Sequence, residues 1–255
     1  MKQYSKVKLR IILIFILIII TNALQNNFRI FLIRYLRNND ALGLIEPSIL
    51  LVQYGILLPL LLKITKVKFN DIGLKFKNLK YGFSLSMKYF LWIIILGTAV
   101  AFIMAYPTYS SFEPRHWTIL RFVDEGWSHF RSILLITALW EEVIIRGLFL
   151  SYLFRIGLDE SFTVKGICIN KVLIITSVGF SLMHVQNFIG VNSLSDVIYM
   201  VVYLFGAVIV GYMLAIIRKK SDSLFWPIMM HALANYFEWV VTILIPILLV
   251  NKFPV

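Results

Sequence analysis

Long apolar runs, separated by short polar segments, occupy almost the whole chain. A helix needs about 20 predominantly apolar residues to cross a bilayer, and seven runs approach or exceed that length. They lie at 11–24, 42–62, 82–105, 131–154, 171–189, 196–217 and 224–249. The pattern predicts an all-α fold, a polytopic transmembrane helical bundle of about seven or eight spans. No Gly-rich phosphate loop, heptad array or internal repeat interrupts it.

The composition leaves no room for a separate soluble domain. Of the 255 residues, 60% are hydrophobic, and the mean hydropathy is +0.83. The only cysteine, Cys168, rules out an internal disulfide framework. No base accompanies it in its own segment, and cysteine is commonly a small buried hydrophobic residue. We therefore assign it no catalytic role.

The formal net charge of +12 would suit nucleic-acid binding, but its distribution indicates membrane topology instead. Short cytoplasmic loops of membrane proteins are enriched in Lys and Arg. With the N-terminus inside, sixteen of the 25 Lys and Arg residues fall in inner segments and seven in outer ones. We expect a multi-pass protein of the cell membrane with a cytoplasmic N-terminus, and no nucleic acid among its partners.

The first segment allows two interpretations. Its Lys-rich start, the apolar run 11–20 and the small residues that follow resemble a signal peptide. The cleavage context is poor, however, so an uncleaved anchor is the favoured interpretation. The topology of the remaining spans is the same in either case.

One apolar run carries three charged residues, Glu141, Glu142 and Arg146. A charge at the centre of a membrane helix costs roughly 2.5–3.5 kcal/mol even on insertion scales that give the smallest values. Residues four apart share a helix face, so Glu142 and Arg146 can pair. Glu141 points about 100° away around the helix and is left unmatched. A surplus carboxylate at membrane depth predicts a functional site.

Two further runs carry histidines. His184 follows Phe180 by one turn, where the phenyl ring could fix the imidazole rotamer. His231 opens the last run and shares a helix face with Asn235, and Glu238, to which we assign no role, continues that stripe. Either histidine alone could equally bond a neighbouring helix. At about 1.5 Å per helical residue, the surplus carboxylate and both histidines lie at depths that permit one shared cavity.

These polar groups resemble, in order, spacing and helical setting, the three signatures of a known family. It is the CAAX protease and bacteriocin-processing enzyme (CPBP) family, intramembrane glutamic endopeptidases related to the Ras-converting CAAX protease. The matching motifs are Glu141-Glu142-x-x-x-Arg146, Phe180-x-x-x-His184 and His231-x-x-x-Asn235. The segment 71–75 also resembles a common family element. Ile145 departs from the phenylalanine of many members, at a position we expect to affect packing only.

The resemblance implies a membrane-embedded CAAX-type glutamic endopeptidase, a hydrolase. Glu141 and His184 would hold and deprotonate a water, and His231 and Asn235 would donate hydrogen bonds to the oxyanion of the tetrahedral intermediate. The residue types suit these roles, because an unpaired carboxylate in a low-dielectric site is a competent base near neutral pH. Donors aimed at a developing oxyanion typically contribute about 3–4 kcal/mol each.

The same resemblance implies that Glu142 and Arg146 form an orienting pair, and that no cofactor is needed. It also divides the chain into three parts. Residues 1–69 would form an N-terminal two-helix membrane region, 70–240 the catalytic helical bundle, and 241–255 the end of the last span and the C-terminal tail.

Three other classes of protein share some of these features. Two histidines and a glutamate are also a zinc-ligand set, so a zinc-dependent membrane protease is the nearest alternative, although no His-Glu-x-x-His helix occurs. A rhomboid-type serine protease is poorly supported, because the segment 179–183 lacks the final glycine of Gly-x-Ser-x-Gly. A proton-coupled transporter or a non-catalytic immunity scaffold remains the non-enzyme alternative, with the lack of repeats arguing against transport.

The expected partners are a membrane-associated peptide or protein substrate and the lipid bilayer. The CPBP family includes enzymes that trim prenylated C-terminal tripeptides and bacterial members linked to peptide maturation and bacteriocin self-immunity. Abundant Lys, Ile and Asn are typical of an AT-rich bacterial genome, and bacteria normally lack prenylated substrates. The sequence therefore favours bacterial peptide maturation, regulation or bacteriocin immunity, and identifies neither the substrate nor the oligomeric state.

Overall fold

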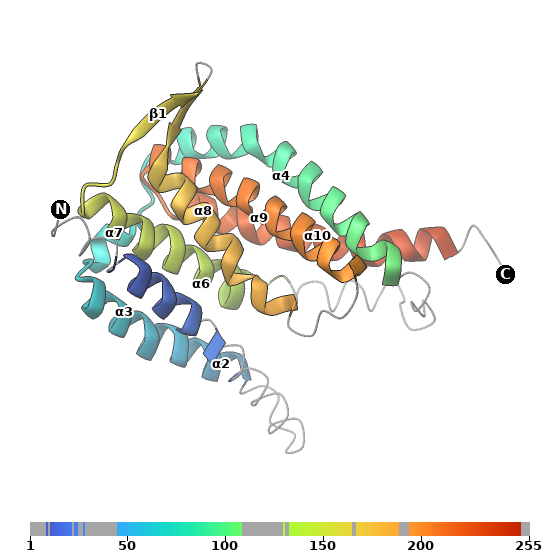
Figure 1. Ribbon diagram of the computed structural model, residues 1–255, viewed down its shortest axis with the longest axis horizontal. Helices are drawn as coiled ribbons and strands as arrows, with labels where there is room; N and C mark the ends of the chain where they lie inside the picture. Colours follow the sequence, from blue (N-terminus) through green and yellow to red (C-terminus); the bar gives the residue numbers. More distant parts are fainter. Residues whose placement is uncertain are drawn as a thin grey trace.

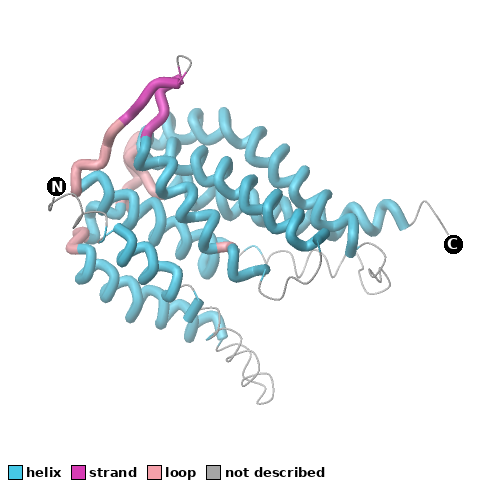
Figure 2. Tube along the Cα trace, in the orientation of Figure 1, coloured by secondary structure: helices cyan, strands magenta, loops and turns pink. Residues whose placement is uncertain are grey.

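The computed structural model describes residues 9, 11–21, 23–24, 28, 45–108, 130, 133–164, 167–188 and 194–250. Over these ranges the chain is almost entirely helical, and the helices lie side by side in one bundle (Figure 1). A two-stranded hairpin projects from one end of the bundle (Figure 2). The catalytic candidates lie on three of the helices.

The first half of the bundle consists of the apolar helix Ile11–Thr21 and two longer helical stretches. The first stretch comprises α2 (Ile45–Leu50), the π-helical η2 (Leu51–Leu57) and α3 (Leu58–Thr65). The 3-10 turn η3 (Phe69–Ile72) then leads to α4 (Leu79–Thr108).

The second half opens with a helix that alternates between α and π geometry along its length. Its parts are η6 (Ile133–Ala138), α6 (Leu139–Glu142), η7 (Val143–Phe149) and α7 (Leu150–Arg155). After the hairpin come α8 (Lys171–Met183), the 3-10 turn η8 (Val185–Phe188), α9 (Leu194–Ser221) and α10 (Phe225–Val250).

The described helices fit the prediction of a membrane-embedded bundle. Three of them are long and apolar enough to cross a membrane, namely Pro47–Thr65, Leu79–Leu96 and Asp196–Ser221. Helices also occur at the other predicted ranges, two of them shorter. Large apolar side chains on α4 and α9 face outward, with Trp92 61% and Phe205 68% exposed. Soluble proteins rarely expose such apolar surface over a wide area, whereas lipid-facing helices do.

The all-α prediction is wrong in one segment. Strands β1 (Ser161–Val164) and β2 (Ile167–Asn170) pair antiparallel between α7 and α8. Short runs rich in β-branched and aromatic residues on either side of a glycine favour a hairpin, but these runs are much shorter than the apolar runs that flank them. The last residue of β2, Asn170, caps α8, because its side chain accepts a hydrogen bond from the backbone nitrogen of Leu173 at 3.2 Å.

The helix 133–155 lies at the centre of the core. Every residue from Val143 to Leu150 is buried, so this part of the helix is packed on all sides. Gly147 makes one of these contacts possible, since a Cβ atom there would lie 2.4 Å from Cγ2 of Ile72. The turn η3 can therefore rest directly on the helix.

A second glycine brings α9 close to the site. α8 packs along α9, and a Cβ atom on Gly211 would lie 3.2 Å from the Arg146 guanidinium and 3.3 Å from the Cα atom of Ser177. Both separations are tighter than ordinary contacts. The glycine thus lets the α9 backbone approach the buried arginine.

Candidate active site

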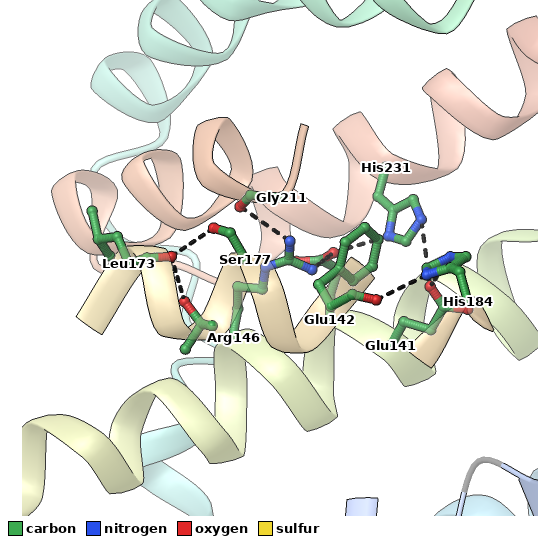
Figure 3. Close-up of polar contacts among 10 residues, drawn as sticks. Glu141, Glu142, Arg146, Leu173, Ser177, His184, Gly211 and His231 are labelled. Atoms are coloured by element: carbon green, nitrogen blue, oxygen red, sulfur yellow. Dashed lines mark hydrogen bonds and ion pairs between the residues drawn. The ribbon is translucent and has the colours of Figure 1, made fainter. Parts of the chain in front are cut away.

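The predicted site residues converge from three helical stretches that are distant in sequence. Glu141 and Glu142 end α6, and Arg146 follows in η7. His184 directly follows α8, and His231 lies in α10. Their side chains point toward one another in the interior of the bundle (Figure 3). The depths estimated from sequence are thus compatible with a shared site.

The predicted pairing of Glu142 and Arg146 is confirmed. Arg146 Nη1 donates to Glu142 Oε1 at 2.6 Å, and both side chains are fully buried. Arg146 Nη2 donates to the carbonyl oxygen of Gly211 at 3.1 Å, and the guanidinium lies over the Phe180 ring, 4.1 Å from its centroid. The buried arginine is therefore held by a carboxylate, a carbonyl and an aromatic face.

Glu142 has a second partner that the sequence did not reveal. Its Oε1 atom also lies 2.9 Å from Nδ1 of His231, on another helix. A carboxylate paired with arginine can only accept, so Nδ1 of His231 carries the proton of this bond. Glu142 thereby orients the His231 ring as well as Arg146, and aims Nε2 in the opposite direction.

His184 is fixed by its neighbour one turn earlier, as predicted. Its ring packs edge-on against Phe180, with 4.8 Å between centroids. Nδ1 of His184 lies 2.9 Å from the backbone oxygen of Phe180, and a carbonyl can only accept. The proton is therefore on Nδ1. In the neutral ring this leaves the lone pair on Nε2.

Glu141 lies between the two histidines. Its Oε2 atom is 3.7 Å from Nε2 of His184 and 3.7 Å from Nε2 of His231. This oxygen is buried and makes no hydrogen bond to a described residue. Because Glu142 is matched by Arg146, the surplus carboxylate inferred from the sequence is the one that faces both imidazoles.

A cavity of about 70 Å³ opens beside these groups. Its walls include His184, His231 and Asn235, so the amide joins the histidines at one space. One water needs roughly 10–15 Å³ by this measure, which leaves room for several. The cavity also touches Tyr203 of α9, which the sequence analysis missed, and Glu238, which it left without a role.

The comparison with known families bears on the same residues. Residues 124–237 match the family model described as "Type II CAAX prenyl endopeptidase Rce1-like". This part of the chain, somewhat less than half of its length, is similar to that family. No curated protein and no solved structure matches the chain.

The matched range holds every residue of the three motifs, from Glu141 to Asn235. Glu238 lies one residue beyond the matched range, although it faces the same cavity.

The zinc alternative requires several His, Cys, Asp or Glu side chains to be grouped around one point. Within the described residues, no group of three or more His, Cys, Asp or Glu side chains has the arrangement of a metal site. Glu141, His184 and His231 nevertheless point three potential ligand atoms toward one region.

Proposed function

We propose that this protein is a glutamic endopeptidase of the membrane, which hydrolyses a peptide bond with a water activated by Glu141 and His184. The observation that carries the proposal is the position of Glu141 Oε2, 3.7 Å from Nε2 of each histidine. One water can hydrogen-bond to Oε2 and to Nε2 of His184 together. That places a nucleophile between two groups able to take its proton.

The reaction begins when the water oxygen attacks the carbonyl carbon of the substrate and Glu141 takes the proton. The carbonyl oxygen then carries the negative charge of the tetrahedral intermediate. Collapse breaks the C–N bond, and Glu141 returns the proton to the leaving amine. His184 keeps the water in place, because its ring is fixed by Phe180 through Nδ1 and the phenyl edge.

His231 and Asn235 are proposed as the donors to the oxyanion. Nδ1 of His231 is already committed to Glu142, so donation through Nε2 requires a proton on both ring nitrogens. The charge of that imidazolium balances Glu141, since Glu142 and Arg146 balance each other. A neutral cluster avoids the cost of a net charge at membrane depth. Asn235 lines the cavity one turn further along α10 and supplies a second donor.

The proposed enzyme is embedded in the membrane. We infer about seven spans with the N-terminus in the cytoplasm, because Lys and Arg are concentrated in the segments that this topology places inside. The matched range 124–237 lies inside the proposed catalytic part, 70–240. The substrate class we propose is a membrane-associated bacterial peptide or protein, in maturation, regulation or bacteriocin self-immunity.

One alternative draws on the same geometry. A zinc ion could use Glu141, His184 and His231, because Nδ1 of each histidine is engaged elsewhere and each Nε2 faces Glu141. These three residues would hold the ion, which would supply Lewis-acid chemistry, and Asn235 would orient the substrate.

Comparative proteomics tests the proposed function. Membranes are prepared from cells that express the wild-type protein, Glu141→Gln or the exposed control Glu160→Gln. We expect at least one peptide to be cleaved with the wild type and the control but to persist uncleaved with Glu141→Gln. Identical peptide profiles for all three would contradict a proteolytic role.

A further inference from the structure

A second, larger cavity of about 780 Å³ lies at the end of the bundle that carries the hairpin. It is bounded by the segment between α3 and α4, the end of α7 and the end of α9. The catalytic cavity shares none of its lining residues. This cavity is therefore a separate feature of the protein.

The charges around this cavity are mostly positive. Two of its cations are paired, Lys219 with Asp159 at 2.7 Å and Arg218 with Asp222 at 3.4 Å. The hydrogen bond from Lys219 lowers the pKa of the Asp159 carboxyl below its usual value, so this pair stays charged.

After these pairs cancel, three cations face one remaining carboxylate. Lys68, Lys75 and Arg155 line the cavity together with Asp71. Arg155 donates to the backbone oxygen of Lys66, which fixes its position without removing its charge. The described lining is thus an anion-binding surface with a net charge of +2.

The segment that carries the two lysines is held rigidly. Arg218 is buried and donates to the carbonyl of Ile72 at 3.2 Å. Its guanidinium lies directly against Gly73, where a Cβ atom would come within 2.1 Å of it. Ser151 donates to the backbone oxygen of Asp71 at 2.8 Å. The cavity is therefore formed in advance of any ligand.

Apolar and aromatic side chains place this end of the bundle at a membrane surface. On the same segment, Phe69 is 56%, Leu74 43% and Phe76 73% exposed. Trp226, at the start of α10, packs against Phe83 at the start of α4. Tryptophan is one of the residues that gather at the level of the lipid headgroups. The same end carries the lysine-rich segments that we place in the cytoplasm.

We propose that this cavity binds the phosphate of an anionic phospholipid headgroup in the inner leaflet, through Lys68, Lys75 and Arg155. Basic pockets at the cytoplasmic ends of membrane helices recognise such headgroups. Leu150 and Phe154 give the cavity an apolar wall, against which the first carbons of an acyl chain can pack. The exposed side chains of Phe69, Leu74 and Phe76, on the segment that carries the two lysines, favour a lipid over a soluble phosphate or an acidic protein.

The test is lipid retention by the full-length protein, purified in a neutral detergent and mixed with equal amounts of phosphatidylglycerol and phosphatidylcholine. Native mass spectrometry counts the bound lipids, and thermal unfolding measures their effect. The double variant Lys68→Gln, Lys75→Gln is compared with Lys77→Gln, Lys80→Gln. The control lysines are exposed, belong to the same end of the bundle and are not among the cavity residues.

We expect the wild type and the control to retain phosphatidylglycerol in preference to phosphatidylcholine. The cavity variant should bind phosphatidylglycerol about 30-fold more weakly, because each substitution removes one positive charge that attracts the headgroup. The conservative variant Lys68→Arg, Lys75→Arg should bind like the wild type, which separates loss of charge from misfolding.

Three results would overturn the proposal. Equal losses in the cavity and control variants would mean a general attraction to negative lipids. Equal stabilisation by inorganic phosphate or glycerol phosphate at the same concentration would assign a soluble anion instead of a lipid. Preferential binding of a polyglutamate peptide would assign an acidic protein partner. None of these readouts depends on proteolysis, so failure here and failure of the proposed protease activity are distinguishable.

Discussion

Nδ1 of His231 lies 2.9 Å from Oε1 of Glu142, and this bond joins residues 89 positions apart in the chain. The same carboxylate oxygen accepts from Arg146 at 2.6 Å. One buried oxygen thus connects the helix of the two glutamates to α10, on which the proposed oxyanion donors lie. The orientation of His231 depends on the charge of Glu142.

The first prediction concerns that charge. Glu142→Gln leaves Arg146 buried without its counterion, and breaking a buried ion pair typically costs about 3–5 kcal/mol. We expect a clearly lower melting temperature and lower activity, because His231 loses its orienting partner. The control Glu160→Gln breaks only the exposed pair with Lys171, which is worth at most about 1 kcal/mol. Equal melting temperatures for the two variants would show that Glu142 does not stabilise the fold.

The second prediction tests the oxyanion role of Asn235. A donor that acts only as charge develops affects the chemical step, so Asn235→Ala should lower kcat by about 10²–10³ while the substrate Kd stays nearly constant. A proton-relay role predicts that Asn235, which does not titrate, matters far less than His231. An immunity scaffold predicts that protection survives the substitution. Weaker binding with an unchanged kcat would remove Asn235 from the chemistry.

The third prediction separates glutamic from metal chemistry. Purified protein treated with a strong chelator and then desalted should keep its activity, and elemental analysis should find far less than one zinc per chain. The elemental analysis is made before the chelator treatment, on the protein purified from membranes. Stoichiometric zinc, with activity lost on stripping and restored on its return, would instead assign Glu141, His184 and His231 as ligands.

Local spacing predicted the parts of the site that lie within one helix. Glu142 and Arg146 are four residues apart, as are Phe180 and His184, and both contacts occur. The positions of the helices also followed from the apolar runs, because burial in lipid requires long apolar segments. Helical periodicity and the lengths of the apolar runs thus predicted the contacts within single helices and the positions of the helices.

The contacts between helices were not predictable, because no sequence spacing encodes them. The Glu142–His231 bond and the Arg146–Gly211 bond depend on how α10 and α9 pack against the central helix. Tyr203 lies in an apolar run where nothing marks it as facing the cavity. The hairpin was missed because its short strands are weaker signals than the long runs on either side.

The central claim, that Glu141 activates the water, is tested most directly by the turnover of purified Glu141→Gln on a substrate peptide identified in membranes. Glutamine keeps the shape of the side chain but cannot take a proton from water. Because glutamine has almost the same shape and the Glu142–Arg146 pair is untouched, we expect the variant to remain folded and inserted in the membrane, with a melting temperature close to that of the wild type. We predict that turnover falls to the background of the uncatalysed reaction. A folded Glu141→Gln protein with turnover near that of the wild type would contradict the account.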